Sequence, residues 1–281
     1  MWINNNKPVS MPIEMISCKW GWMMCPPGDQ FVTGSLRRWG VYSETESMLL
    51  KQLVAKRDVL IVGGTIGAIA APLSQVSGYM EVYEPQPVIA ELLKANVELA
   101  GTNYAVVVNG AVGPEEGEIQ VPIVKFDADC NMGRIGKENW GKGHAVPMYD
   151  INDVLTKHKF DFALLDVEGM ELEILKAAKP ELLPELMWVE CDREDIGKEL
   201  IQFIQDSGYA AYWMITPLTP NGMNPMDGPW NLQSSFNLLC VKTGVEWPLG
   251  TSVPQYLASP SDAIGNCPAD MLIWNYQPSS V

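Results

Sequence analysis

The sequence has few of the residues that build metal sites and disulfide scaffolds. Its six cysteines form no CxxC pair, which excludes a zinc ribbon and a dense disulfide framework. The histidines are His144 and His158 alone, so a histidine-rich metal site is excluded as well. The cysteines are therefore expected to be reduced and mostly structural.

Long apolar runs are also missing. The N-terminus begins Met1-Trp2-Ile3-Asn4 and lacks the basic stretch and following apolar run of a secretory signal. No later apolar run approaches the ~18 residues needed to span a bilayer. These absences predict a soluble, cytoplasmic protein with no membrane partner.

Positive charge is scarce. The chain has 19 Lys and Arg residues against 34 Asp and Glu residues, and its net charge of −15 would repel the phosphates of nucleic acids. We therefore expect a small molecule or a glycan, and no nucleic acid, as the partner. The sequence leaves a homo-oligomer open.

From Asp58 onward, short apolar runs alternate with amphipathic segments. The runs predict strands at 59–62, 80–83, 104–108, 160–165, 186–190, 210–215 and 235–241, and the segments predict helices at 66–76, 88–100, 170–178 and 196–207. Such alternation builds an open α/β sheet, mostly parallel and Rossmann-like, with helices on both faces.

The chain divides into three parts. Residues 1–43 show no clean period and predict an irregular N-terminal arm, residues 44–243 form the α/β domain, and residues 244–281 are a tail packed on it. Insertions at about 113–159 and 216–234 interrupt the domain, and the first contains an extra strand at 118–124. Connections of this length tend to be covers of functional sites or disordered segments.

A glycine-rich turn follows the first strand. Val59–Val62 runs into Gly63-Gly64-Thr65-Ile66-Gly67, at the carboxyl edge of the sheet, where glycines let a ligand approach free backbone N–H groups. A dinucleotide fingerprint needs glycine at the third and sixth positions, but these are Thr65 and Ala68. This argues against a nicotinamide oxidoreductase. Tight packing alone is the structural alternative.

An acidic residue ends the second strand. Glu84 precedes Pro85 and can accept hydrogen bonds from both hydroxyls of a ribose that lies across the glycine turn. By itself Glu84 could be a solvated strand end. Its position one crossover after the glycine turn favours a nucleoside site.

A family pattern runs through several segments of the chain. They are Val59–Gly67, Glu81–Pro87 with Leu92–Val97, Asn109–Gly113 and Leu165–Leu175. The most specific element is Asp166-Val167-Glu168-Gly169-Met170-Glu171. In order and spacing the segments resemble the FkbM-type family of class I S-adenosylmethionine (SAM)-dependent methyltransferases.

The resemblance implies a seven-stranded sheet with an antiparallel last strand, SAM as methyl donor, and a set of cofactor contacts. Gly63, Gly64, Thr65 and Gly67 would contact the methionine part of SAM, Glu84 its ribose, and Asn109, Gly110 and Ala111 its adenine. The family usually has an acid just ahead of the glycines, where this chain has Ile61. This departure motivates an alternative, a non-catalytic protein that keeps the fold and binds a nucleoside or a partner.

Three residues are candidates for catalysis. Asp166 and Glu168 follow the fourth strand, and either could take the proton of an acceptor hydroxyl or orient that hydroxyl. Asp166 could instead cap the next helix and bind the amino group of SAM. His144, in the first insertion, is a third candidate base because its pKa lies near neutrality, although a lone loop histidine can simply be exposed.

Two more acids, Glu190 and Asp192, end the fifth strand on the same edge. With Asp166 and Glu168 they could hold a divalent cation, or they could be helix caps and solvated strand ends, and a metal is not favoured. The sequence as a whole predicts O-methylation of a hydroxyl on a sugar or small polar metabolite. A nitrogen or carboxylate acceptor is the alternative, because the insertions that would read the acceptor carry no transferable motif.

Overall fold

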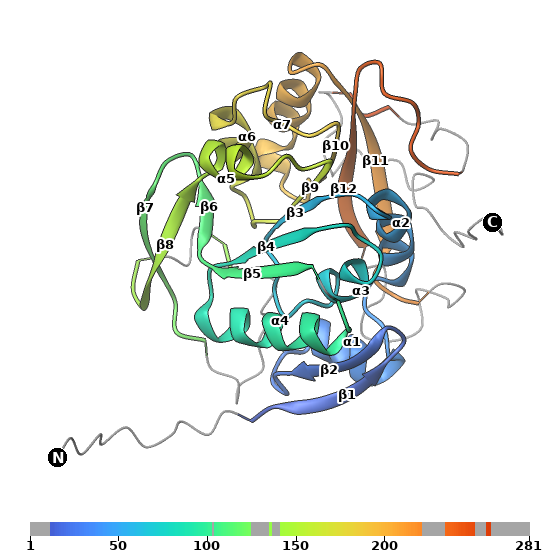
Figure 1. The fold of residues 1–281 in the computed structure, drawn as a ribbon, viewed down its shortest axis with the longest axis vertical. Helices are drawn as coiled ribbons and strands as arrows, with labels where there is room; N and C mark the ends of the chain where they lie inside the picture. Colours follow the sequence, from blue (N-terminus) through green and yellow to red (C-terminus); the bar gives the residue numbers. More distant parts are fainter. Residues whose placement is uncertain are drawn as a thin grey trace.

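A sheet of seven strands forms the centre of the molecule (Figure 1). The computed structural model describes residues 12–102, 104–124, 135–136, 141–220, 234–250 and 257–259. In spatial order the strands are β11 (Tyr209–Pro217), β12 (Ser234–Lys242), β10 (Leu186–Glu190), β9 (Phe162–Leu165), β3 (Val59–Val62), β4 (Met80–Glu84) and β5 (Ala105–Asn109). Strand β12 is antiparallel to both neighbours, and the strands from β10 to β5 are parallel. The predicted fold class is confirmed.

The central strands are buried on both faces. Every residue of β3 and of β9 is buried, and both strands are continuous apolar runs. Along β3, Leu60 and Val62 belong to one hydrophobic core, whereas Val59 and Ile61 belong to the other. Because successive side chains of a strand point to opposite faces, such a run fits a strand that is covered by helices on both sides.

Helices supply the two covering layers. Helices α2 (Glu44–Val54), α3 (Ala70–Ser74) and α4 (Pro87–Leu99) contribute to one core, and α5 (Ile151–Lys157), α6 (Glu171–Ala177) and α7 (Glu194–Asp206) contribute to the other. Helix α3 is shorter than the helix predicted over 66–76, since residues 65–69 form turns and a bend. Pro72 lies in its first turn, where a missing N–H breaks no intrahelical bond.

The N-terminal segment is more regular than predicted. Strands β1 (Glu14–Cys18) and β2 (Gly21–Cys25) form an antiparallel hairpin, and helix α1 (Val32–Trp39) follows. The prediction of an irregular arm is therefore wrong for residues 14–39. Strand β2 lacks the polar–apolar alternation that indicates a strand, and the hairpin turn lacks an Asn-Gly or Asp-Gly signal.

The buried side-chain amide of Asn96 links this hairpin to helix α4 and to the turn after β3. Asn96 of α4 accepts a hydrogen bond at Oδ1 from the N–H of Met24 (2.6 Å), and its Nδ2 donates to the carbonyl oxygens of Met24 (2.9 Å) and Ile66 (2.7 Å). Met24 belongs to β2, and Ile66 to the turn after β3. A single side chain thus joins three segments.

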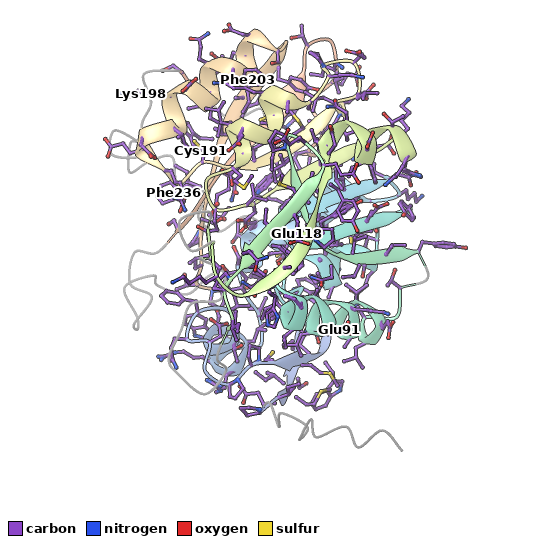
Figure 2. All side chains as sticks on the ribbon, turned by 90° about the vertical axis from the view of Figure 1, so that its left-hand side faces the viewer. Glu91, Glu118, Cys191, Lys198, Phe203 and Phe236 are labelled. Atoms are coloured by element: carbon purple, nitrogen blue, oxygen red, sulfur yellow. The ribbon has the colours of Figure 1, made fainter. Side chains whose placement is uncertain are left out.

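A second, three-stranded sheet has the order β6 (Ala111–Gly113), β8 (His144–Asp150) and β7 (Gly117–Val121). Figure 2 looks onto this sheet, with Glu118 of β7 on it and Glu91 of α4 below. Strand β7 confirms the strand predicted at 118–124, but the regular structure of β8 and α5 was not predicted. Pro147 within β8 argues against a strand on sequence grounds. Residues 125–134 and 137–140 of this insertion lie outside the described residues.

The remaining segments are described only in part. Residues 221–233 of the second predicted insertion, and residues 251–256 and 260–281 of the predicted tail, lie outside the described residues. Residues 257–259 run beside β11, where the N–H of Ala258 donates to the carbonyl of Ala211. In the part of the chain that the structure describes, no helix is both long and apolar enough to cross a membrane.

Candidate functional site

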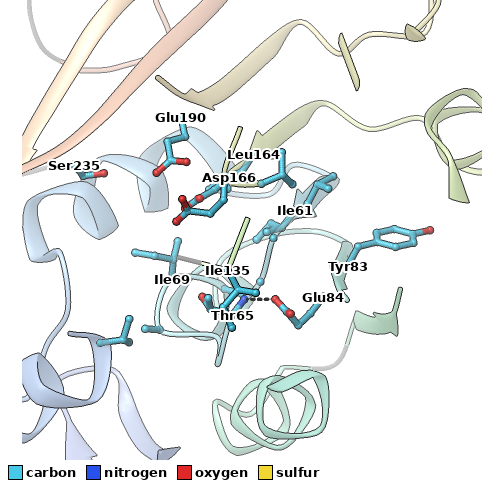
Figure 3. A pocket seen from close by; sticks show the side chains of 18 of the residues that line it. Ile61, Thr65, Ile69, Tyr83, Glu84, Ile135, Leu164, Asp166, Glu190 and Ser235 are labelled. Atoms are coloured by element: carbon cyan, nitrogen blue, oxygen red, sulfur yellow. Dashed lines mark hydrogen bonds between the residues drawn. The ribbon is translucent and has the colours of Figure 1, made fainter. Parts of the chain in front are cut away.

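A cavity of about 520 Å³ lies at the carboxyl ends of the parallel strands (Figure 3). This volume is in the range of small-molecule sites. The lining combines the turn after β3, the ends of β4, β9 and β10, part of β12, and side chains from α1 and α2. The cavity therefore gathers residues from most of the described chain.

The turn after β3 brings the backbone to the cavity. Gly63 has a φ of +93°, and a Cβ there would lie 1.8 Å from the carbonyl oxygen of Asp166. Only glycine allows the turns after β3 and β9 to approach so closely. Thr65 also has a positive φ of 43°, and its N–H donates to Glu84 Oε2 (2.9 Å). The turn presents main chain to a ligand, as a nucleotide-type pocket requires.

Glu84 is buried at the end of β4 and is fixed through both carboxylate oxygens. Oε2 accepts the bond from Thr65, and Oε1 accepts the N–H of Gln86 (2.8 Å). Burial raises the pKa of Glu84 to about 7, against the opposing effect of these backbone hydrogen bonds. Glu84 therefore titrates near neutral pH and can accept further hydrogen bonds.

Three other carboxyl groups converge in the same cavity. Asp166, Glu168 and Glu190 offer oxygen atoms that all lie within 4.8 Å of one another. Asp166 follows β9 and Glu190 ends β10, and the parallel register that pairs Leu165 with Val189 brings the two acids side by side. Figure 3 shows their carboxyl groups close together, with Ser235 of β12 to one side.

Asp166 and Glu190 affect each other's protonation. Surrounding protein atoms, and then the negative charges nearby, raise the pKa of each carboxyl well above its ordinary value. Asp166 is nevertheless exposed to the cavity, and water there weakens the effect of burial while the like charges remain. The negative charge of Asp166 raises the pKa of Glu190, and carboxyl oxygens of the two residues lie within 4.8 Å of each other. They therefore titrate as a unit.

Hydrogen bonds within the segment Asp166–Glu171 stabilise the turn after β9. Glu168 has a φ of +53°, which residues other than glycine rarely adopt. The carboxylate of Glu171 accepts the N–H groups of Val167 (2.8 Å) and Gly169 (3.1 Å). Glu168 Oε2 lies 3.5 Å from Arg193 Nη2. The acids of the motif therefore divide into a structural one, Glu171, and two that line the cavity.

Ile61 is buried in the core and lines the cavity where the resemblance expects an acid. Another carboxyl group reaches the lining from α2. Glu46 Oε1 accepts hydrogen bonds from Trp188 Nε1 (3.1 Å) and Asn237 Nδ2 (3.0 Å), and Oε2 accepts one from Ser43 Oγ (2.6 Å). Burial raises the pKa of Glu46, and these hydrogen bonds oppose the shift. Glu46 thus ties α2 to β10 and β12 at the cavity wall.

The lining is rich in acids. Its carboxyl groups belong to Glu46, Glu84, Asp166, Glu168, Glu190 and Asp192. No lysine, arginine or histidine occurs among the described residues of the lining. The cavity therefore favours ligands with positive charge or hydrogen-bond donors and disfavours anions.

The structure brings most of the predicted site residues to this cavity. The lining includes Gly63, Gly64, Thr65, Glu84, Gly110, Ala111, Asp166 and Glu168. Gly67 and Asn109 are not part of it. A Cβ on Gly67 would come within 2.9 Å of the Leu93 side chain, and Asn109 Nδ2 donates to the carbonyl oxygens of Glu84 (2.9 Å) and Pro85 (3.1 Å). Both residues shape turns beside the cavity.

His144 lies at the start of β8, where it pairs with Val121 and is exposed. Val121 lines the cavity, but His144 does not. Glu46 and Gln86 also line the cavity, although neither was predicted from the sequence. Glu46 contacts residues 142 and 191 positions further along the chain, which no local signal reveals. Gln86 stands inside the segment Glu81–Pro87 that carried the resemblance, and its place next to Glu84 was the available signal.

Comparison with protein families gives one match. The methyltransferase FkbM domain matches residues 62–210, just over half of the chain. No curated protein matches.

Several solved structures are similar. Precorrin-6y C5,15-methyltransferase from Geobacter metallireducens is 12% identical over 70% of this chain and 87% of that chain, with a TM-score of 0.47. Fibrillarin from Aeropyrum pernix, with bound SAM, is 13% identical over 70% and 74%, with a TM-score of 0.41. Magnesium protoporphyrin IX methyltransferase from Synechocystis, also with bound SAM, is 10% identical over 76% and 85%, with a TM-score of 0.41.

Proposed function

This chain belongs to the FkbM family of SAM-dependent methyltransferases, and on that premise we propose that it methylates a hydroxyl group of a sugar or another small polar metabolite. One observation carries the proposal: a single cavity has two chemically different sides. Thr65 of the glycine turn and Glu84 lie on one side, and the carboxyl groups of Asp166 and Glu190 lie on the other (Figure 3). A nucleoside donor and a hydroxyl acceptor can meet between them.

The first side fits SAM. The glycine turn allows a ligand close to the backbone, Glu84 can accept hydrogen bonds from ribose hydroxyls, and the acidic lining complements the sulfonium and ammonium charges. When bound, SAM supplies an activated methyl group. The acids of the lining provide the negative charge that Ile61 does not.

The second side supports removal of a hydroxyl proton. Asp166 is exposed to the cavity, and surrounding protein atoms together with the like charges around it raise its pKa, which makes its carboxylate a stronger base than an ordinary aspartate. It accepts the proton that the acceptor hydroxyl loses on methylation. Glu190 lies beside Asp166, and the like charges of the two carboxyl groups favour uptake of a proton by the pair. Glu168, beside Arg193, orients the acceptor.

The charge of the lining supports an uncharged acceptor. A phosphate or carboxylate beside Asp166 and Glu190 would face negative groups with no lysine, arginine or histidine in the described lining to offset them. Sugar hydroxyls can instead donate hydrogen bonds to these carboxyl groups. A carboxylate acceptor is disfavoured for the same reason.

We also propose that the reaction needs no metal ion. The spacing of Asp166, Glu168 and Glu190 suits a divalent cation. However, Arg193 lies beside Glu168, and burial and the neighbouring negative charges raise the pKa values of Asp166 and Glu190, which favours their protonated forms. These two features reduce the negative charge of the cluster.

Methyl transfer from labelled SAM to a panel of neutral sugars tests the proposal. Asp166→Asn should lower kcat by about 100-fold or more, because general base catalysis contributes on the order of 10²–10⁴. Asp195→Asn, an exposed position on α7, serves as the matched control and should keep wild-type activity. Binding of S-adenosylhomocysteine to Asp166→Asn should stay within about threefold of wild type.

The outcomes separate the alternatives. Label found on a nitrogen or on a carboxylate would overturn O-methylation and keep the enzyme class. Binding of SAM without transfer to any acceptor would favour the non-catalytic alternative that Ile61 motivates. Full activity of Asp166→Asn would refute the role proposed for that residue.

A further inference from the structure

Two residues that line the cavity, Gln86 and Glu190, have a buried polar side-chain atom without a hydrogen-bond partner among the described residues, and in Gln86 that atom is a donor. Gln86 is 5% exposed, and its amide nitrogen Nε2 is completely buried with no hydrogen-bond partner. Gln86 stands at the N-cap of α4, yet its side chain makes no capping hydrogen bond. Gln86 is one of the residues that line the cavity. A buried N–H donor without an acceptor destabilises a protein. The unpaired donor of Gln86 therefore points to a bound ligand that supplies the acceptor.

The carboxylate of the neighbouring Glu84 cannot replace the Gln86 amide as a hydrogen-bond donor. Glu84 and Gln86 are adjacent in space, since the backbone N–H of Gln86 donates to Glu84 Oε1 at 2.8 Å. An ionised carboxylate only accepts hydrogen bonds. Both oxygens of Glu84 already accept one backbone N–H each. A hydroxyl group, by contrast, both donates and accepts, so a pair of adjacent hydroxyls needs an acceptor and a donor.

We propose that Gln86 is a further cofactor-binding residue, whose amide nitrogen donates a hydrogen bond to a ribose hydroxyl oxygen of SAM while Glu84 accepts from the ribose diol. The proposal rests on the SAM site described under the proposed function and adds to it. Glu84 and Gln86 form a matched acceptor and donor for a vicinal diol. The amide nitrogen of Gln86 then has a hydrogen-bond acceptor only when a nucleoside is bound.

The proposal predicts effects of opposite sign on stability and on binding. Gln86→Met keeps an unbranched side chain of similar length and removes the buried donor. Without ligand, the variant should be at least as stable as wild type, with an equal or higher Tm, because no N–H is left unsatisfied. Its affinity for S-adenosylhomocysteine should fall about 3- to 10-fold, the range for loss of one neutral hydrogen bond.

Calorimetric titration with S-adenosylhomocysteine and with its 2′-deoxy and 3′-deoxy analogues assigns the loss to the ribose. Wild type should bind one of the deoxy analogues more weakly than the parent, and Gln86→Met should show a smaller penalty for that analogue. Gln202→Met, an exposed position on α7, is the control and should behave as wild type. A structural role of Gln86 would lower the Tm and would not change the penalty.

Two results would overturn the proposal. Equal affinity of wild type and Gln86→Met for S-adenosylhomocysteine would remove Gln86 from the site and leave the methyltransferase assignment intact. The same holds if the deoxy penalties of the two proteins are equal. Failure of wild type itself to bind either SAM or S-adenosylhomocysteine would refute both the site and the role of Gln86.

Discussion

At the scale of single residues, Glu84 combines burial with a position that a ligand should use. Its two backbone hydrogen bonds favour the charged form, but burial outweighs them and raises the pKa to about 7. The charged carboxylate is thus formed at a cost in the ligand-free protein. A ribose diol that donates to it would lower that cost.

This shift has a predictable effect on stability. The pKa of Glu84 lies above its ordinary value of 4.5, so the folded state binds the proton more tightly than the unfolded state. The resulting stabilisation is full below pH 4.5 and is lost as the pH rises through about 7. Urea unfolding of ligand-free protein at pH 5 and pH 8 measures it. Glu84→Gln should lose less stability over this range than wild type, by on the order of 3 kcal/mol.

The control for this prediction is Glu91→Gln, at an exposed position of α4. It should show the wild-type pH dependence, which still includes the raised pKa values of Asp166 and Glu190. Identical pH dependence in wild type and Glu84→Gln would contradict the assigned shift.

At the scale of elements, the attachment of the N-terminal hairpin depends on few polar contacts. Asn96→Asp keeps the acceptor for the N–H of Met24 but removes the donor to the carbonyl oxygens of Met24 and Ile66. The carbonyl oxygens of Met24 and Ile66 lose this donor, and a charge is introduced at a buried position. The variant should be destabilised by about 2–4 kcal/mol.

Hydrogen exchange locates the effect. The amides of β2 should exchange faster in Asn96→Asp, whereas those of β3 and β9 should keep their relative protection. Asn152→Asp on α5, whose amide nitrogen also donates to a backbone carbonyl, is a comparison on the opposite layer. Loss of protection spread evenly over the sheet would contradict a local role for Asn96.

The elements also show what the sequence could and could not predict. Strands β3 and β9 were predictable because fully buried parallel strands are continuous apolar runs bounded by turn residues. The hairpin β1–β2 and strand β8 were missed, because β2 has no alternation and β8 contains Pro147. Their strand conformation depends on pairing with neighbours, which local sequence does not encode.

At the scale of the whole molecule, the excess of acidic residues continues into the cavity, and it bears on the question of metal. We expect methyl transfer to stay within about twofold of its initial rate after treatment with EDTA, with no gain on adding Mg²⁺ or Mn²⁺. Arg193 and the raised pKa values of Asp166 and Glu190 already reduce the negative charge of the cluster. Loss of activity on chelation, with recovery on adding either ion, would contradict this.

The candidate site was predictable only where it is local in sequence. The glycine turn, Glu84 and Asp166 follow or end recognisable strands. Parallel topology therefore places all three at the same edge of the sheet. The hydrogen bonds of Glu46 with Trp188 and Asn237, in contrast, join residues far apart in the chain. The unpartnered amide of Gln86 is likewise a property of packing that a sequence does not display.

The position of Glu46 also constrains the order of events during synthesis of the chain. The ribosome releases α2 early, but Trp188 and Asn237, which bind its carboxylate, follow 142 and 191 residues later. Until these two residues are synthesised, Glu46 lacks both of these hydrogen-bond partners, and the wall of the cavity is incomplete. A nascent chain that ends before β12 should therefore contain the glycine turn and Glu84 but lack a complete cavity wall, so that cofactor binding should require synthesis to continue through β12.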